Sequence, residues 1–236
     1  MRVYFFPKWL IQAMLILLCG LLAAGIVWSF LGGDDASVMA EPVYQGNSKE
    51  QKVALAINVD WGEDILPGML DVLAKEQVKA TFFVTGRFAE KFPELVEEIA
   101  AAGHEIGNHG YKHPHPDELS VEQNQKDITQ AEAILEKLTE TKPVLYAPPY
   151  GEHGKTCLMA AEQCGYTTIL WTLDTIDWEK PAPSQETLVQ RVTGDKLSSG
   201  AIILMHPKEH TLEALPAMIQ AIRDKGYQCM KVSEVL

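Results

Sequence analysis

From residue 53 onward, short apolar runs alternate with longer amphipathic segments, and this alternation limits the fold more than any other feature of the chain. The apolar runs predict strands at residues 53–58, 80–85, 105–109, 144–146, 167–170, 201–205 and 227–232. The segments between them predict helices at residues 66–76, 87–102, 121–138, 155–163, 184–197 and 211–225. Strands that alternate with helices are typical of a parallel sheet covered by helices. We therefore predict an α/β fold, and both a doubly wound sheet and a closed barrel fit the pattern.

Helix boundaries carry the expected end signals. Ser120 precedes a predicted helix and Gln123 follows three residues later, which is the pattern of a capping box. Gly103, Gly165 and Gly226 each follow a predicted helix, where glycine adopts the left-handed conformation that ends helices. These signals support the predicted element boundaries.

Polar segments gather just past predicted strands. They are residues 58–64, 109–113, 148–151 and 174–178, together with His206. In parallel α/β folds the carboxyl ends of the strands are the edge where sites assemble. We therefore expect the functional site at that edge.

Two of these segments hold candidate metal ligands. His109 and His113 lie four residues apart, and the acidic segment 58–64 contains Asp60. Two imidazoles and one carboxylate form a ligand set for zinc or a similar divalent ion with an open position, which indicates metal-assisted hydrolysis. Alone, the histidine spacing is weak, because two exposed histidines near a turn are common.

The N-terminus predicts a membrane anchor. Residues 9–33 carry no charge, and at ~1.5 Å per residue they are long enough to cross a ~30 Å hydrocarbon core. Arg2 and Lys8 precede this stretch, so the positive-inside rule places the N-terminus in the cytoplasm. A cleavable signal peptide ending near Ala40, giving a secreted form, is the alternative, but the long apolar run favours an uncleaved single-pass anchor in the cell membrane. The predicted divisions are a cytoplasmic terminus 1–8, a transmembrane helix 9–33, a linker 34–51 and an extracellular domain 52–236.

The net charge constrains the partners. The chain carries −12, and residues 1–40 are balanced, so the predicted extracellular part carries the whole excess. Such a surface argues against nucleic acid and other anionic polymers as partners. Neutral or partly cationic glycans remain compatible, and a solvated surface that maintains solubility explains the charge itself.

Four ordered motifs resemble those of one family. They are Gly-His-Glu-Ile-Gly-Asn-His at 103–109 with His113, Pro-Pro-Tyr-Gly at 148–151, Asp-Thr-Ile-Asp-Trp at 174–178 and Leu-Met-His at 204–206. The chain resembles the polysaccharide deacetylase family, the NodB-homology carbohydrate esterases of family 4. The resemblance covers about residues 53–236. Its Trp-Gly-acid variant of the first motif resembles the branch found in spore-forming bacteria.

The resemblance implies a fold and a reaction. The fold is a distorted (β/α)7-type barrel, here preceded by the predicted transmembrane helix. The reaction is the hydrolysis of N-acetyl groups from aminosugar polymers of the cell wall, such as peptidoglycan, or from chitin-like chains. The metal, held by Asp60, His109 and His113, would be Zn²⁺ by preference, although Co²⁺, Ni²⁺ and Fe²⁺ suit the same ligands.

The resemblance also implies roles for further residues. His206 would protonate the leaving amine, and Asp177 would orient His206. Four residues would bind the substrate: Pro149, Tyr150 through its backbone N–H, Trp178 and Leu204. Trp61 and Trp171 are candidates to stack on sugar rings, with core packing as the alternative.

Two positions depart from the family pattern. The family's first motif is Thr-Phe-Asp-Asp-Gly, in which the first Asp is the general base and the second binds the metal. In this chain the base position falls on Asn58, and Asp60 is the remaining carboxylate for the metal, shifted by one residue. An amide cannot accept a proton near neutral pH. The family also has Arg before Pro-Pro-Tyr, where this chain has Ala147.

The two losses are coherent, because a partly buried guanidinium left without its carboxylate would cost about 3–5 kcal/mol. Two functions follow. The first is a membrane-anchored metal-dependent N-deacetylase, whose base would be Asp60, Glu63, Asp64 or metal-activated water. The prevalence of enzymes in the family slightly favours this function. The second is an inactive metal- or glycan-binding pseudoenzyme on the same fold. A purely structural ectodomain is a weaker third, because the histidines and Asp177 are intact.

Overall fold

Residues 41–236 are described by a computed structural model. The strands are β1 (Lys52–Val59), β2 (Thr81–Val84), β3 (Glu105–Asn108), β4 (Leu145–Tyr146), β5 (Thr167–Thr168), β6 (Leu173–Asp174), β7 (Ile202–Met205) and β8 (Gln228–Met230). The α-helices are α2 (Leu66–Lys75), α3 (Gly86–Lys91), α4 (Pro93–Ala101), α5 (Val121–Thr139), α6 (Lys155–Gln163), α7 (Gln185–Val192) and α8 (Glu209–Asp224). Short 3-10 turns are η1 (Pro116–Glu118), η2 (Pro149–Gly151) and η3 (Val232–Glu234).

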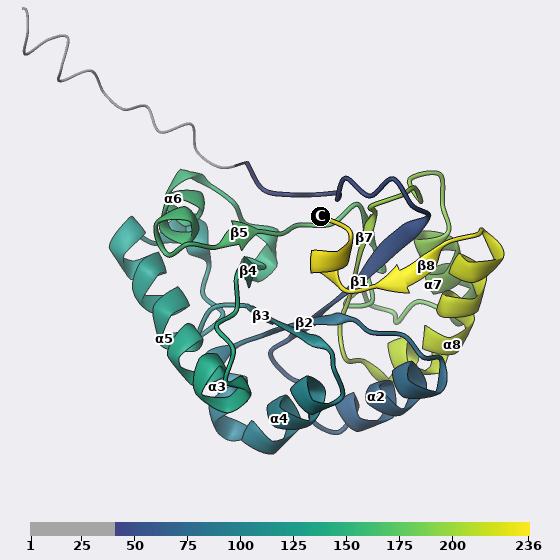
Figure 1. Cartoon of the computed structure of the whole chain (residues 1–236), viewed down its shortest axis with the longest axis horizontal. Coiled ribbons are helices and arrows are strands. Elements are labelled where there is room, and N and C mark those ends of the chain that lie inside the picture. The colour runs from purple at the N-terminus through teal and green to yellow at the C-terminus, as the bar shows by residue number, and fades with distance from the viewer. Residues whose placement is uncertain (1–40) are drawn as a thin grey trace, which may run out of the picture. The chain divides into compact units, whose positions relative to one another are not determined.

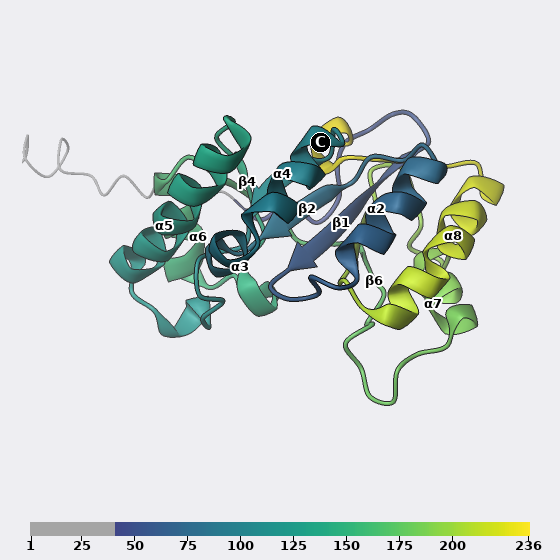
Figure 2. The ribbon, with the colours of Figure 1, turned by 90° about the horizontal axis from the view of Figure 1, so that it is seen from below.

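The strands form one curved sheet. Their order is β5-β4-β3-β2-β1-β7-β6, with β8 pairing β1 as well, and the strand pairs are parallel. Figure 1 shows β1 near the middle, with helices α2, α4, α5 and α8 arranged around the outer side. In Figure 2, α2 and α4 lie in front of β1 and β2. The prediction of a parallel α/β fold is confirmed, and this half-barrel fits the (β/α)7 architecture.

The side chains on the two faces of β1 differ in size. Val53, Leu55, Ile57 and Val59 belong to the large cluster that packs against the outer helices. Ala54 and Ala56 belong to a smaller cluster on the inner face. Successive side chains of a strand point to opposite faces, so Asn58 continues the inner row. This alternation carries a polar side chain from the inner face to the carboxyl end of the central strand.

A strap of residues 41–46 bridges β5, at one end of the sheet, and β7, the strand beside the other end. Val43 pairs with Ile169 beyond β5, and Gln45 pairs with Ala201 before β7. Figure 1 shows this segment crossing the open side of the half-barrel. The predicted linker 34–51 therefore ends too late, because backbone bonds such as Gly46 N–H to the Gly200 carbonyl (2.8 Å) tie the strap to the domain. Polar composition alone did not reveal that pairing.

One predicted element needs correction, and one strand was not predicted. The helix predicted at 87–102 is two helices, because Pro93 has no N–H to continue α3 and instead begins α4. The strand β6 at 173–174 was not predicted, because two residues are too short to show periodicity. The capping box at Ser120 and Gln123 is present as predicted.

The predicted membrane anchor lies outside the residues that the structure describes. Within 41–236, no helix combines the length and the apolar character needed to cross a membrane. The predicted transmembrane helix 9–33 and the signal-peptide alternative lie outside the described residues, so the localisation at the cell membrane stays a prediction.

We predict that Gly46→Ala lowers the free energy of unfolding by about 2 kcal/mol. A Cβ at residue 46 would lie 1.9 Å from the Val235 carbonyl oxygen, so the strap must move and lose its bonds. Urea unfolding followed by circular dichroism measures the change. Gly194→Ala is the matched control, since its nearest neighbour would be 3.4 Å away. Equal stability of the two variants would contradict a structural role for the strap.

Candidate functional site

A cavity of about 490 Å³ opens at the carboxyl ends of the strands. This is the edge where the sequence predicted the site. Its lining residues are Asn58, Asp60, Trp61, Arg87, His109, His113, Tyr150, Gly151, Trp171, Asp174, Trp178, Leu204 and His206. The structure thus brings together most of the predicted site residues.

The turn that carries the two histidines is held from two sides. The carboxylate of Asp127, on α5, accepts hydrogen bonds from the N–H groups of Tyr111 (2.8 Å) and Lys112 (3.1 Å). On the other side, Gly86 N–H donates to the Gly110 carbonyl (2.9 Å) at the start of α3. His113 has a φ of 56°, a left-handed conformation that such a pinned turn can maintain. The histidines therefore rest on a fixed backbone.

Both histidines are neutral near pH 7. His109 donates from Nδ1 to the Ala147 carbonyl at 2.6 Å, which leaves Nε2 with its lone pair. Burial, with smaller effects from the neighbouring His113, His206 and Arg87, lowers the pKa of His109 to about 3. Burial is also the main cause that lowers the pKa of His113. The two ring centroids are 4.9 Å apart.

Asp60 is engaged by an arginine. Its carboxylate is 7% exposed and accepts hydrogen bonds from Arg87 Nε (2.6 Å), from Arg87 Nη2 and from Thr85 Oγ1 (2.9 Å). Thr85 also caps α3 by accepting from Phe88 N–H, so the same residue places Asp60 and the first turn of the helix that carries Arg87. Both carboxylate oxygens of Asp60 therefore have partners within the protein.

This arrangement does not match the ligand set that the family implies. Polysaccharide deacetylases of this family are generally metal-dependent, and the two neutral imidazoles are suitable ligands. In residues 41–236, however, no three His, Cys, Asp or Glu side chains are gathered so as to hold a metal ion. Asp60 faces a guanidinium instead. The prediction that Asp60, His109 and His113 bind zinc therefore stays a prediction.

The histidine at the end of β7 has a buried carboxylate behind it. Asp177 Oδ1 is 2.7 Å from His206 Nδ1, and Asp177 Oδ2 accepts from His206 N–H (2.7 Å) and from Thr211 Oγ1 (2.8 Å). Burial alone would raise the pKa of Asp177, but the hydrogen bonds and charge of His206, with the Thr211 hydroxyl, outweigh it and leave that pKa below its ordinary value. An ionised carboxylate there fixes the ring and leaves Nε2 of His206 toward the cavity.

The two substituted positions lie on the inner face of the sheet. Asn58 is 5% exposed, and its Oδ1 has no hydrogen-bond partner within the described residues. Ala147 is buried in the same inner cluster as Ala54 and Ala56. A buried amide oxygen without a donor costs about 1–3 kcal/mol. Neither an ionised base nor an arginine occupies these two positions.

Aromatic side chains surround the mouth of the cavity. Tyr150 is 58% exposed and Trp178 57% exposed, which is unusual for such large side chains. Tyr150 stacks on His115, with the ring centroids 4.0 Å apart. Trp61 lies parallel to His206, with the centroids 5.8 Å apart. Exposed aromatic faces around a cavity suit a ligand with flat apolar surfaces, such as the faces of sugar rings.

Some predicted residues do not line the cavity. Asp177 lies behind His206, and Ala147 and Pro149 are buried beneath the surface. Two lining residues were missed. Arg87 lies in the Thr-Gly-Arg segment that follows β2, and this segment carries too few polar residues to stand out in the sequence. Asp174 belongs to the Asp-Trp motif, in which the resemblance implies roles for Asp177 and Trp178 only. Burial raises the pKa of Asp174.

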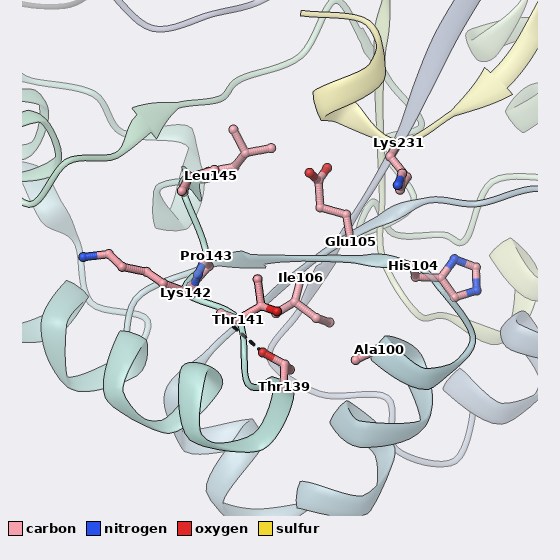
Figure 3. A pocket seen from close by; sticks show the side chains of 11 residues that line it. Ala100, His104, Glu105, Ile106, Thr139, Thr141, Lys142, Pro143, Leu145 and Lys231 are labelled. Atoms are coloured by element: carbon pink, nitrogen blue, oxygen red, sulfur yellow. Dashed lines mark hydrogen bonds between the residues drawn. The ribbon is translucent and has the colours of Figure 1, made fainter.

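A second hollow of about 300 Å³ lies at the amino-terminal ends of β3 and β4 (Figure 3). It is lined by residues such as His104, Glu105 and Lys231. The Glu105 carboxylate already accepts from Thr81 Oγ1 at 2.6 Å, and Lys142 extends away from the other side chains in Figure 3. None of the predicted site residues lines this hollow.

The comparisons with known proteins identify the family. The sequence model described as polysaccharide deacetylase matches residues 45–169, more than half of the chain. The chain belongs to the polysaccharide deacetylase family. It is 35% identical over 190 residues to a peptidoglycan-N-acetylglucosamine deacetylase of Bacillus cereus, covering 78% of this chain and 68% of that protein.

Other polysaccharide deacetylase relatives bear on activity. An uncharacterized protein of Bacillus subtilis, YlxY, is 42% identical over 200 residues, which cover 85% of this chain and 62% of that protein, less than two thirds of its length. A crystal structure of a family 4 carbohydrate esterase pseudoenzyme from Bacillus anthracis superposes with a TM-score of 0.79 at 37% identity, covering 83% of this chain and 69% of that chain. A mutant of that pseudoenzyme with restored enzymatic activity has also been crystallised, with a TM-score of 0.79 at 36% identity, over 83% of this chain and 71% of that one. The family therefore includes both active enzymes and an inactive relative of similar structure.

We predict that His109 makes the domain less stable in mild acid. The folded protein holds the pKa of His109 at about 3, against an ordinary value of 6.5, so below pH 6.5 protons bind preferentially to the unfolded chain. The contribution is complete above pH 6.5 and falls by about 2 kcal/mol by pH 5. Urea unfolding at pH 7 and pH 5 measures it. The loss should shrink in His109→Gln and persist in the exposed control His115→Gln, and an unchanged loss in His109→Gln would refute the assignment.

Proposed function

We propose that this protein is a deacetylase-like, glycan-binding protein whose pocket takes N-acetylated aminosugar polymers without deacetylating them. One observation carries the proposal. Asn58 occupies the expected base position with a buried amide oxygen that has no partner within the described residues, and Asp60, two residues along, is hydrogen-bonded by Arg87 and Thr85. A general base must accept a proton from the attacking water, and neither side chain is free to do so.

The proposed ligand follows from the pocket and the relatives. Exposed Tyr150 and Trp178 provide flat faces for sugar rings, and buried Leu204 with Trp178 would hold the methyl group of an acetamide. The Bacillus cereus relative is a peptidoglycan-N-acetylglucosamine deacetylase, which supports a cell-wall glycan. In this proposal Tyr150 donates its backbone N–H to the oxygen atom of the bound acetamide, and His206 Nε2 accepts a hydrogen bond from an N–H or O–H group of the glycan.

The proposed cellular place rests on the sequence. An anchor at residues 9–33 would hold the domain outside the cell membrane, within reach of cell-wall glycan, and cleavage near Ala40 would release it. The acidic charge keeps nucleic acid an unsuitable partner in this proposal. The Trp-Gly-acid motif supports a role in spore-forming bacteria.

Which of the two carboxylates is missing depends on how the family's Thr-Phe-Asp-Asp-Gly motif is aligned with this chain. If Asp60 is the metal's carboxylate, the base is missing at Asn58. If the motif is placed on Gly62, its two acids fall on Asp60 and Trp61. Gly62 has a φ of +98°, and a Cβ there would lie 2.5 Å from the Pro207 ring, so glycine is required. Both alignments leave the centre one carboxylate short, which is why the proposal does not depend on the choice.

A metal-dependent N-deacetylase is the second candidate, and the His206–Asp177 pair favours it. That pair could protonate a departing amine, and His109 still presents Nε2. A divalent ion held by the histidines and Asp60 would supply Lewis-acid activation of water and of the acetyl carbonyl. Asp60 would have to leave Arg87 first. Loss of general-base help typically lowers the rate by ~10²–10⁴-fold.

We predict that the wild-type protein binds N-acetylglucosamine oligomers but releases no acetate from them or from peptidoglycan, even with excess zinc or cobalt. Isothermal titration measures binding, and an enzyme-coupled assay measures acetate. Asn58→Asp/Ala147→Arg and Trp61→Asp are tested in parallel, because each restores the carboxylate that one alignment lacks. Acetate release by one of them should identify the missing group. Robust release by the wild type that is lost in His206→Ala would establish the second candidate instead.

We predict that Trp178→Ala weakens oligomer binding by about tenfold, because stacking on one aromatic face is worth about 1 kcal/mol or more. The same titration measures it. Tyr44→Ala is the control, since Tyr44 is also an exposed aromatic but lies on the strap and not in the cavity. A similar loss in both variants would show that the oligomer does not bind at the carboxyl edge.

A further inference from the structure

The clearest unexplained group in the cavity is Arg87. Its side chain lines the cavity and is 49% exposed, although its partner Asp60 is only 7% exposed. The motifs that identify the family do not include it. A cation therefore stands at the edge of the pocket where the family would lead one to expect a metal ion.

The contacts of Arg87 show what this cation does. Its Nε and Nη2 donate to the two carboxylate oxygens of Asp60, a fork that matches a carboxylate better than any single-point donor. Thr85 Oγ1 donates to Oδ1 as well. A carboxylate with three donors has its negative charge compensated and its lone pairs engaged. Binding a metal through Asp60 would first require breaking this fork.

The position of Arg87 relative to the histidines points the same way. Its side chain lines the same cavity as both His109 and His113, so the guanidinium and the two rings surround one space. A divalent ion between these rings and Asp60 would lie beside the same guanidinium. Two cations in one small cavity repel each other, whereas a single guanidinium leaves the site balanced against Asp60.

Arg87 also has donors to spare. A guanidinium carries five N–H groups in a planar fork, and its contacts with Asp60 involve only Nε and Nη2. The side chain lines the cavity, so Nη1 can donate to an oxygen of a bound glycan, such as an acetamide carbonyl or a sugar carboxylate. Arginine suits this task, because it stays charged and is less strongly hydrated than lysine.

We infer that Arg87 takes the electrostatic place of a metal ion in this pocket: it holds Asp60 away from any divalent cation and anchors an oxygen of the glycan in the cation's stead. The inference about the glycan rests on the proposed function. The inference about the metal does not, because it concerns only the competition between Arg87 and a cation for Asp60.

The first test is a zinc titration of the full-length protein in mild detergent. The wild type should bind weakly, through the histidines alone, and Asp60→Asn should not weaken it further. Arg87→Ala should bind zinc at least about tenfold more tightly, the scale on which neighbours of metal ligands act. That gain should vanish in Arg87→Ala/Asp60→Asn. Cobalt absorption in the visible range gives an independent measure of the coordination number.

Two further variants keep the test decisive. Arg223→Ala removes an arginine that pairs with Glu76 and does not line the cavity. It therefore controls for the loss of one positive charge. If Arg87→Ala is too unstable to purify, Arg87→Lys is measured in its place. This variant keeps a positive charge near Asp60, so its zinc binding should stay weak. Wild-type zinc binding that is tight, lost in Asp60→Asn and indifferent to Arg87→Ala would overturn the inference.

The second test measures binding of an N-acetylglucosamine tetramer with and without EDTA. Wild-type affinity should be the same in both, and Arg87→Ala should weaken it at least about tenfold. Tetramer binding that EDTA abolishes would overturn the inference. If no variant binds the tetramer, the proposed function fails, and the zinc titration still decides whether Arg87 excludes a metal ion from Asp60.

Discussion

The central strand β1 is the element on which the rest of the structure depends. It pairs with β2, β7 and β8, and its side chains are buried on both faces. A strand enclosed in this way cannot shift by one residue without placing leucine and isoleucine in the narrow inner face and alanine against the helices. Its register therefore determines where the side chains of Asn58 and Asp60 lie at the carboxyl end of the sheet. Through β2 and β7, the sheet then brings the two histidines that follow β3 and the His206 that follows β7 to the same edge.

The buried carboxylates of the pocket are each hydrogen-bonded, and Asp174 accepts from the Ile176 N–H at 2.7 Å. Asp60 faces Arg87, and Asp177 faces His206 and Thr211. His109 is neutral, and the expected carboxylate and guanidinium are replaced by Asn58 and Ala147. Buried ions remain stable only when they are paired or hydrogen-bonded, and Asp60 and Asp177 both meet this condition. This explains why the cavity can persist as a binding surface without the full set of reacting groups.

The sequence predicted the elements whose information is local. β1 follows from its apolar run, and α5 follows from a capping box and a helical stripe, both of which are encoded within a few residues. The polar edge was predictable because parallel strands align their carboxyl ends. The fork between Arg87 and Asp60 was not, because it joins residues 27 positions apart in sequence, and only the pairing of β1 with β2 brings them together. The strap was missed for the same reason: its partners, Ile169 and Ala201, are distant in sequence.

The paired absence at Asn58 and Ala147 has a simple energetic logic. A buried carboxylate at 58 without its arginine, or an arginine at 147 without its carboxylate, would cost about 3–5 kcal/mol in a domain of ordinary stability. The observed amide leaves one oxygen unpartnered, at about 1–3 kcal/mol, and alanine leaves no polar group at all. Once one member is gone, replacing the other is therefore stabilising. The reverse path requires both charges to return together, so a pocket of this kind stays neutral at that position while Asp60, already satisfied by Arg87, keeps its charge.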